Sequence, residues 1–401
     1  MSLKFVGARV VLPDDVVETE VVVEDGVIAE IGGGAADRTV DARGLILAPA
    51  LIDVHGDAFE RQLMPRPGVH FPTEAALLDT DRQLAANGFA TAYHAVTLSW
   101  EPGLRSVANG AEVIDALDRL APRLTVENRV QLRWETFAFE AVDLIRRALD
   151  GPLTPSIAFN DHTSMTLRDR SKPLQERLFE YDPEFRATPL DDPAVAVSVE
   201  SSAKRAGLSV PDYLSLLREV WARRPDAPGK IDEVAAMGRA AGAPMLSHDD
   251  TQHATREHFR ERGARIAEFP MRAEVAQAAR DAGDAIVFGA PNVVRGGSHI
   301  GSPSAADMAE DGLSDALASD YYYPAPLAAV ARLVEDRRLA LPKAWAQVSS
   351  GPAAAMNLGD RGRIAEGLRA DLALVDWPEG AAPAVRATYS AGRCAYWAEA
   401  A

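Results

Sequence analysis

The fold is decided by one stretch of the sequence, Leu45-Ile-Leu-Ala-Pro-Ala-Leu-Ile-Asp-Val-His-Gly-Asp57. An apolar run bounded by turn residues is typical of a short buried strand, and this one ends abruptly in His55-Gly-Asp57. Because His55 and Asp57 are two residues apart, strand periodicity places both side chains on the same side. An imidazole and a carboxylate that converge at a strand end can hold a divalent metal, although a strand ending in polar turn residues would give the same pattern.

Beyond this stretch, the middle of the chain alternates short apolar runs with helical patterns. Eight such runs predict a closed α/β barrel of the (β/α)₈ type over residues 51–350. The predicted strands are Leu51–Val54, Ala90–Val96, Val130–Trp134, Pro155–Phe159, Pro244–Ser247, Ile266–Phe269, Ala285–Phe288 and Ala316–Ser319. Residues 163–230 exceed one β/α unit, so we expect a helical excursion over the barrel mouth, either a lid or a surface insertion.

Both ends of the chain are rich in strand patterns. Near the N-terminus we expect strands at Phe5–Val11, Glu18–Val23, Val27–Ile31 and Leu45–Leu47. Near the C-terminus, residues Gly362–Val375 predict two strands joined by a Gly turn, and Arg386–Ser390 and Arg393–Trp397 predict a hairpin. Each half alone would leave an apolar face uncovered. Residues 1–50 and 351–401 are therefore predicted to form one small β-sandwich domain.

Composition narrows the class of partner. The formal net charge of −17 disfavours nucleic acid and anionic membranes as partners, while one local basic pocket would still accept a phosphorylated small molecule. The single cysteine, Cys394, excludes an internal disulfide and fits a reducing compartment. No apolar run approaches transmembrane length and no leader pattern opens the chain, so we expect a cytoplasmic protein, with a homo-oligomer left open.

Function in such a barrel is expected at the carboxyl ends of the strands. Nearly every predicted strand ends in a group that can bind a metal or move a proton, which favours a metal site over a set of polar caps. The strongest candidate ligands are His55, Asp57, His248 and Asp320, with Asp320 also the candidate general base. A second set has less defined roles: Glu135 as a bridge between two metals, His162 as a ligand or a structural histidine, Asp161 as its orienting partner, and Asp249, Asp250 and Glu268.

Basic loops supply a further pattern at the same end. In Arg295-Gly-Gly-Ser-His299, Gly296 and Gly297 let backbone N–H groups close on an anion, and Arg295 adds a bidentate charge. Arg61 and Arg66 follow the first barrel strand, and Arg168, Arg170 and Lys172 lie early in the excursion. Each could be a solvated loop cation. Together they favour a polyanionic substrate, with Arg61, Arg66, Arg295, Gly296, Gly297 and His299 as its predicted contacts.

These motifs resemble the amidohydrolase superfamily, through the strand-one His-x-Asp, the eight barrel strands, the strand-eight Ser-Asp and the split β domain. Longer stretches resemble the diphosphatases of the carbon–phosphorus lyase pathway within it. These are Leu63-Met-Pro-Arg-Pro-Gly-Val69, Ser247-His-Asp-Asp250, Ala267-Glu-Phe-Pro270, Gly289-Ala-Pro-Asn-Val-Val-Arg-Gly-Gly-Ser-His299, Ser319-Asp-Tyr-Tyr322, Asn357-Leu-Gly-Asp-Arg-Gly362 and Gly367-Leu-Arg-Ala-Asp-Leu372. One departure stands in the metal motif, where that family usually has Thr in place of Gly56.

The resemblance implies hydrolysis of α-D-ribose 1-methylphosphonate 5-triphosphate, or a related ribosyl 5-triphosphate, to the 5-phosphate and pyrophosphate. It also implies one or two divalent metal ions, with zinc expected and manganese or iron as alternatives. Two other functions remain open from the residues alone. One is hydrolysis of an amide or cyclic amide, which needs the same metals but no basic pocket. The other is a non-catalytic subunit of a phosphonate-processing assembly, which would have no use for the ligand set.

Overall fold

The computed structural model describes residues 2–298 and 300–399. Its centre is a parallel eight-stranded sheet in which the strands follow one another in chain order, from β8 to β15. All eight predicted barrel strands are confirmed, with ends that differ by a few residues. They are β8 (Leu51–Gly56), β9 (Phe89–Leu98), β10 (Glu127–Glu135), β11 (Ser156–Asn160), β12 (Met245–His248), β13 (Ile266–Glu268), β14 (Ala285–Gly289) and β15 (Ala316–Ala318).

The barrel closes where β8 meets β15. The Asp57 N–H donates to the Asp320 carbonyl and the Asp320 N–H donates to the His55 carbonyl, both at 2.9 Å. Behind them, the buried Asp53 carboxylate accepts hydrogen bonds from the backbone N–H and the hydroxyl of Ser319. The first and last strands of the barrel are therefore joined at their carboxyl ends.

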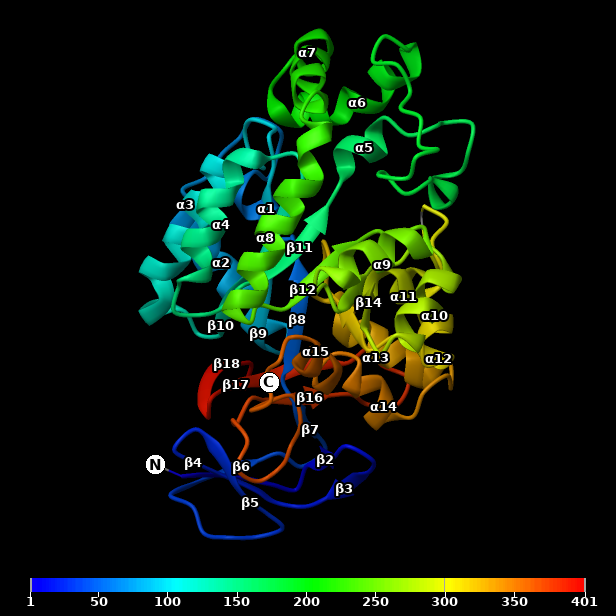
Figure 1. The fold of residues 1–401 in the computed structure, drawn as a ribbon. Coiled ribbons are helices and arrows are strands. Elements are labelled where there is room, and N and C mark those ends of the chain that lie inside the picture. The colour runs from blue at the N-terminus through cyan, green and yellow to red at the C-terminus, as the bar shows by residue number, and fades with distance from the viewer. Residues whose placement is uncertain (1, 299, 400–401) are drawn as a thin grey trace.

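Helices cover the outside of the barrel (Figure 1). Most of them bury apolar side chains in one of two large clusters, whereas α15 (Ser350–Ala355) contributes Ala353 to the cluster inside the barrel. The barrel interior is filled by a separate cluster that includes Ile52, Tyr93 and Leu246. The helices are α1 (Glu60–Leu63), α2 (Thr73–Ala86), α3 (Val107–Leu120), α4 (Val142–Leu149), α8 (Ala227–Ala241), α9 (His253–Glu261), α10 (Ala273–Asp281), α11 (Ala290–Arg295), α12 (Ala305–Glu310), α13 (Ala325–Glu335), α14 (Leu341–Ala346) and α15 (Ser350–Ala355).

The predicted excursion is helical in part. It contains α5 (His162–Thr166), α6 (Pro193–Ala206) and α7 (Val210–Trp221), and α8 then leads back to the barrel. Ser209 caps α7 by accepting the Asp212 N–H, and Asp192 caps α6 by accepting the Ala194 N–H. In Figure 1 these helices lie at one end of the molecule, beyond the carboxyl ends of the barrel strands, while both termini lie at the opposite end.

Strands from both termini form the sheets at that opposite end. One sheet has the order β18-β17-β16-β7-β2-β3, so it combines N-terminal and C-terminal strands, and the other has the order β5-β4-β1-β6. Their shared core includes Phe5, Leu47, Leu374 and Tyr389. The strands are β1 (Leu3–Val6), β2 (Arg9–Val11), β3 (Val16–Glu18), β4 (Val21–Glu24), β5 (Val27–Ile31), β6 (Arg38–Asp41), β7 (Ile46–Pro49), β16 (Leu372–Asp376), β17 (Ala384–Ser390) and β18 (Arg393–Trp397).

Three sequence expectations for these sheets were wrong. Gly7 has a positive φ of 75°, so the predicted strand Phe5–Val11 is two strands, β1 and β2. The predicted strand Glu18–Val23 is likewise divided between β3 and β4. The first of the two strands predicted within Gly362–Val375 is absent, because that segment contributes only single backbone contacts such as the bridge between Val27 and Arg369.

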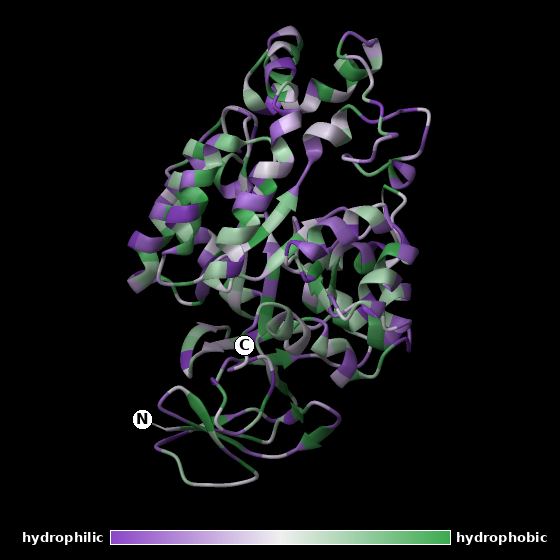
Figure 2. Cartoon of the chain, viewed as in Figure 1, coloured by the Kyte–Doolittle hydropathy of each residue, from purple (hydrophilic) through white to green (hydrophobic). Residues whose placement is uncertain are grey.

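Hydropathy follows this architecture. In Figure 2, β8 is hydrophobic at its lower end and hydrophilic at its upper end, where it approaches the excursion. The hydrophilic end carries His55, which is nonetheless only 1% exposed. Within residues 2–298 and 300–399, no helix has both the length and the apolar character that crossing a membrane requires.

Candidate metal centre at the barrel mouth

Three overlapping groups of potential metal ligands meet at the carboxyl ends of the strands, and one of them, His55, His248 and Glu268, links the other two. His55, Asp57 and Asp320 form one group, on the seam where β8 meets β15. The other group consists of His162, His248 and Asp249. Within each group the ligand atoms lie within 4.8 Å of one another. The predicted set is thus brought together in space, with Asp249 beside the two histidines and not behind them.

Glu268 lies beneath both groups and is fully buried. Its two carboxylate oxygens contact the Nδ1 atoms of His55 and His248, at 2.9 and 2.7 Å. Burial raises the pKa of Glu268, but the two rings outweigh this and hold the pKa well below its usual range. An ionised carboxylate only accepts hydrogen bonds, so both rings donate from Nδ1 and have an acceptor lone pair at Nε2. Glu268 therefore orients the two histidines.

Arg133 is a residue of the site that the sequence analysis missed. It is 8% exposed and its guanidinium reaches His248 Nε2 at 3.1 Å, Asn160 Oδ1 at 3.2 Å and Asp57 Oδ2 at 3.5 Å. Arg133 thus places a fixed positive charge between the two ligand groups. The pattern Arg133-Trp-Glu135 could have revealed it, because residues two apart on a strand share a face and Glu135 was already a candidate.

Glu135 and His162 form a pair on neighbouring strand ends. The Glu135 carboxylate accepts hydrogen bonds from the His162 ring Nδ1 and from the His162 backbone N–H. Burial raises the pKa of Glu135, but the His162 ring and Arg133 lower it to about 2. Glu135 therefore holds His162 as Glu268 holds His55, and its predicted role as a bridge between metals remains a prediction.

Two of the other predicted carboxylates have structural partners. The orienting role expected of Asp161 belongs to Glu135, because Asp161 instead caps α5 by accepting the backbone N–H and the hydroxyl of Ser164 at 2.8 and 2.7 Å. Asp250 is 1% exposed, accepts the Ser247 hydroxyl and lies 3.6 Å from Arg256. Neither residue belongs to the ligand groups.

A cavity of about 220 Å³ opens onto the ligand groups. Its lining contains His55, His248, Asp249 and Asp320 together with Arg295 and Gly297 from the end of α11. Three of the predicted substrate contacts do not line this cavity: Arg61, Arg66 and Gly296. Arg61 nevertheless lies close to it, because it donates to the backbone carbonyl of Tyr321, which is a lining residue. Arg66 takes part in a tight turn with Val69. The predicted contact His299 lies outside the described residues.

The backbone at the site is unusual. Asp249, Phe269 and Asp320 all have positive φ, at 58°, 54° and 55°. Only a few per cent of non-glycine residues adopt this region, and Asp tolerates it better than Phe does. The three residues follow β12, β13 and β15, so the chain turns sharply as each strand delivers its side chain to the mouth. Such conformations cluster at functional sites.

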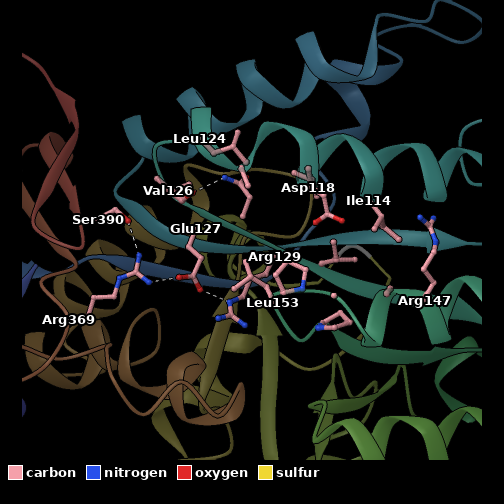
Figure 3. Close-up of a pocket in the computed structure, with 18 of the residues that line it drawn as sticks. Ile114, Asp118, Leu124, Val126, Glu127, Arg129, Arg147, Leu153, Arg369 and Ser390 are labelled. Carbon is pink, nitrogen blue, oxygen red and sulfur yellow. Dashed lines mark hydrogen bonds and ion pairs between the residues drawn. The ribbon is translucent and has the colours of Figure 1, made fainter.

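A second cavity, of about 350 Å³, lies at the other end of the barrel and does not belong to this site (Figure 3). Its lining is largely apolar, with residues such as Leu124 and Leu153 between α3, α4 and the start of β10. Figure 3 shows Arg129 and Arg369 directed at the same carboxylate, Glu127. These cations are already neutralised by the chain.

Comparison with known proteins agrees with this geometry. The chain is 31% identical over 373 residues to α-D-ribose 1-methylphosphonate 5-triphosphate diphosphatase of Escherichia coli strain K12, covering 91% of this chain and 93% of the relative. A model of the amidohydrolase family also matches residues 217–396. The chain is an amidohydrolase. This family membership confirms the resemblance noted in the sequence.

Solved amidohydrolase-like structures share the fold. Phenylurea hydrolase B superposes with a TM-score of 0.62 at 14% identity, covering 98% of this chain and 96% of its own. An adenosine deaminase from Xanthomonas campestris with bound zinc gives a TM-score of 0.61 at 14% identity, covering 98% and 92%. At such low identity these matches establish the barrel fold of this amidohydrolase and nothing finer.

The residues of the amidohydrolase site fit a divalent metal. Glu268 fixes the tautomers of His55 and His248, so each Nε2 is an acceptor, and Asp57, Asp249 and Asp320 belong to the same two groups. A metal at His248 Nε2 would replace the Arg133 guanidinium, which lies 3.1 Å from it. Imidazole and carboxylate together suit zinc, manganese or iron. Neighbouring carboxylates in a buried site repel one another, as the raised pKa of Asp320 beside Asp57 shows, and a divalent cation would relieve this repulsion.

Proposed function

We propose that this chain is a metal-dependent hydrolase of phosphonate catabolism. Its substrate would be α-D-ribose 1-methylphosphonate 5-triphosphate, or a related ribosyl 5-triphosphate, and its products the 5-phosphate and pyrophosphate. The observation that carries this proposal is the pair of imidazole–carboxylate groups facing a cavity that also presents Arg295. The similarity to the E. coli diphosphatase over 91% of the chain supports it.

In the cytoplasmic enzyme, one or two zinc ions would be held by the members of the two ligand groups. These are His55, Asp57, His162, His248, Asp249 and Asp320. A divalent metal at this position would supply Lewis acidity toward water and toward the phosphoryl oxygens. Glu268 and Glu135 fix the imidazoles beforehand, so little reorganisation is needed when the substrate arrives.

Asp320 is the residue we assign to proton transfer. It lies at the strand-eight end of the seam and lines the cavity. Burial and the neighbouring Asp57 raise the pKa of Asp320 to about 6. The attacking water would form the new bond to phosphorus and give its proton to this carboxylate. The anhydride bond between the α and β phosphates would break, and its electron pair would leave with pyrophosphate.

Arginines stabilise the charge that this step spreads over the phosphoryl oxygens. Arg133 lies within the ligand groups, and Arg295 faces them across the cavity. Arg295 would form charge-assisted hydrogen bonds with an anionic end of the substrate, each contributing roughly 1.5–3 kcal/mol. A neutral amide substrate would have no use for these contacts.

The test is an assay of metal-analysed protein with a ribosyl 5-triphosphate. We expect about one or two equivalents of zinc, manganese or iron, and release of pyrophosphate, not orthophosphate. Arg295→Ala should lower kcat/KM by about tenfold or more. Arg218→Ala, which changes an exposed arginine of α7, serves as the matched control.

Two results would overturn the proposal. Efficient hydrolysis of an amide, with no turnover of the triphosphate and no effect of Arg295→Ala, would favour the amide alternative. Protein that carries no metal and gains no activity when metal is added would favour a non-catalytic role.

A further inference from the structure

The barrel mouth has another cavity besides the one lined by Arg295. It has a volume of about 280 Å³ and lies on the excursion side of the candidate metal centre. Its walls are the ends of β9 and β10 and residues of α5, α6 and α7. Four arginines line it: Arg105, Arg168, Arg170 and Arg205. Two glutamates, Glu101 and Glu135, also face it. We call this space the excursion cavity.

The four arginines are not equally neutralised. Arg105 forms a two-pronged ion pair with Glu60, and Arg205 pairs with Glu101 at 2.7 Å. Arg168 and Arg170 instead donate to backbone carbonyls of Met165 and Thr166, at 3.2 and 2.7 Å. Among the residues the structure describes, neither of these two guanidinium groups has a carboxylate within ion-pair distance.

Burying Arg168 and Arg170 without a counter-charge is energetically unfavourable when no ligand is bound. Arg168 and Arg170 lie near each other, and burial together with Arg170 lowers the pKa of Arg168. The Nε atoms of Arg168 and Arg170 and the hydroxyl of Thr97, which also lines the cavity, are buried without a hydrogen-bond partner in the described part of the chain. Unused donors and two unpaired positive charges in one cavity are the features that an oxyanion would satisfy.

The excursion cavity is adjacent to the candidate metal centre. Glu135 and His162 line it, and the His162 ring lies 5.8 Å from the His248 ring, which lines the Arg295 cavity. The ligand groups therefore lie between two cavities. The Arg295 cavity, of about 220 Å³, has apolar walls that include Phe269, Phe288 and Ile300, and two arginines line it. The excursion cavity has four lining arginines.

We propose that the excursion cavity is the binding site of the leaving pyrophosphate, held by Arg168 and Arg170. The ribosyl end of the substrate would then occupy the Arg295 cavity, where the apolar walls suit a sugar and Arg295 suits its one anionic substituent. This inference rests on the proposed function. It makes the excursion a determinant of substrate class rather than a surface insertion.

The test measures binding of inorganic pyrophosphate to the metal-loaded protein by titration calorimetry, with metal content checked afterwards. Arg168→Gln/Arg170→Gln should weaken binding by about tenfold or more, because charge-assisted hydrogen bonds are lost. Arg168→Lys/Arg170→Lys keeps the charge and should recover part of the affinity. Arg218→Gln on α7 should bind as the unchanged protein does. Thermal melting shows whether each variant is folded, and the single variants replace the double one if it is not.

Hydrolysis of the ribosyl triphosphate is measured in parallel, so that the two proposals fail separately. Unchanged pyrophosphate affinity in the Arg168 and Arg170 variants overturns the site even if the triphosphate is cleaved. A loss confined to Arg295→Gln also overturns it, because pyrophosphate would then bind in the other cavity. Pyrophosphate binding that depends on Arg168 and Arg170, in a protein that does not cleave the triphosphate, supports the anion site and overturns the proposed reaction.

Discussion

Both ends of the barrel have arginines around a cavity, but the two ends differ in the groups that pair with these arginines. At the base, Glu127 contacts Arg129, Arg361 and Arg369, which links β10 to the C-terminal segment. At the mouth, the hydrogen bonds of Arg168 and Arg170 within the described part of the chain go to backbone carbonyls only. Position near a cavity therefore does not make a cation available to a ligand. What matters is whether the chain has already supplied the counter-charge.

Deleting the strands at the base of the barrel should have the largest effect on the stability of the protein. Deletion of residues 361–401 removes β16, β17 and β18 together with Arg361 and Arg369, and it exposes Phe5 and Leu47 of the shared core. The remainder should aggregate, because a large apolar surface loses its cover. Size-exclusion chromatography checks this. A monodisperse and active truncation would contradict the prediction that both termini build one domain.

Asp320→Asn changes the mouth and leaves the base intact. The variant keeps the side-chain shape but loses the basic oxygen, so kcat should fall by roughly 10²-fold or more. Metal analysis should show a smaller loss of metal than in His248→Ala, while the thermal midpoint should stay close to that of the unchanged protein. Near-normal turnover in metal-replete Asp320→Asn protein would remove Asp320 from the proton-transfer role.

Glu127→Gln should weaken the ion pairs at the base of the barrel and leave the candidate metal centre at the mouth unchanged. It leaves Arg129, Arg361 and Arg369 without their shared carboxylate, which should lower the free energy of unfolding by about 3 kcal/mol. Chemical denaturation measures this loss, and triphosphate turnover of the folded variant serves as the control. A loss of turnover without a loss of stability would mean that the two ends are not independent.

The same carboxylate gives this prediction a pH dependence. Burial raises the pKa of Glu127, but the three arginines lower it to about 2, below its usual value of 4.5. The stabilisation is therefore fully present above about pH 4.5 and is lost as the pH falls through about 2. The stability difference between the unchanged protein and Glu127→Gln should shrink as the pH is lowered from 5 to 3. A constant difference would contradict the assignment.

Gly56→Ala is the smallest change and lies on the seam of the barrel. A Cβ at this position would lie 2.5 Å from the Asp53 carboxylate, which is buried and bonded to Ser319. Crowding of this kind should cost about 1–3 kcal/mol. Gly229→Ala in α8, where a Cβ meets nothing within 4 Å, is the matched control and should stabilise by up to about 1 kcal/mol. Equal stability of Gly56→Ala and the unchanged protein would show that Asp53 can move.

The sequence predicted the barrel well because each strand is marked locally. Apolar runs ending in His55, Glu135, His248 or Asp320 show both the strand and the residue that it delivers to the mouth. The role of Glu268 was not predictable, because β13 lies across the barrel from His55 and only closure brings the two together. The unpaired state of Arg168 and Arg170 was equally hidden, since it depends on which carboxylates the folded excursion leaves out of reach.

The seam between β8 and β15 has a consequence for the order of assembly. Asp53 and Ser319, which join these strands, are 266 residues apart in the chain. The loop that must close between them is long, so its entropic cost is met only after the intervening strands have paired. His55 and Asp57 meet Asp320 only at that point. A partly synthesised or partly folded chain therefore holds an incomplete ligand set, and this group of candidate ligands is assembled only when the barrel is complete.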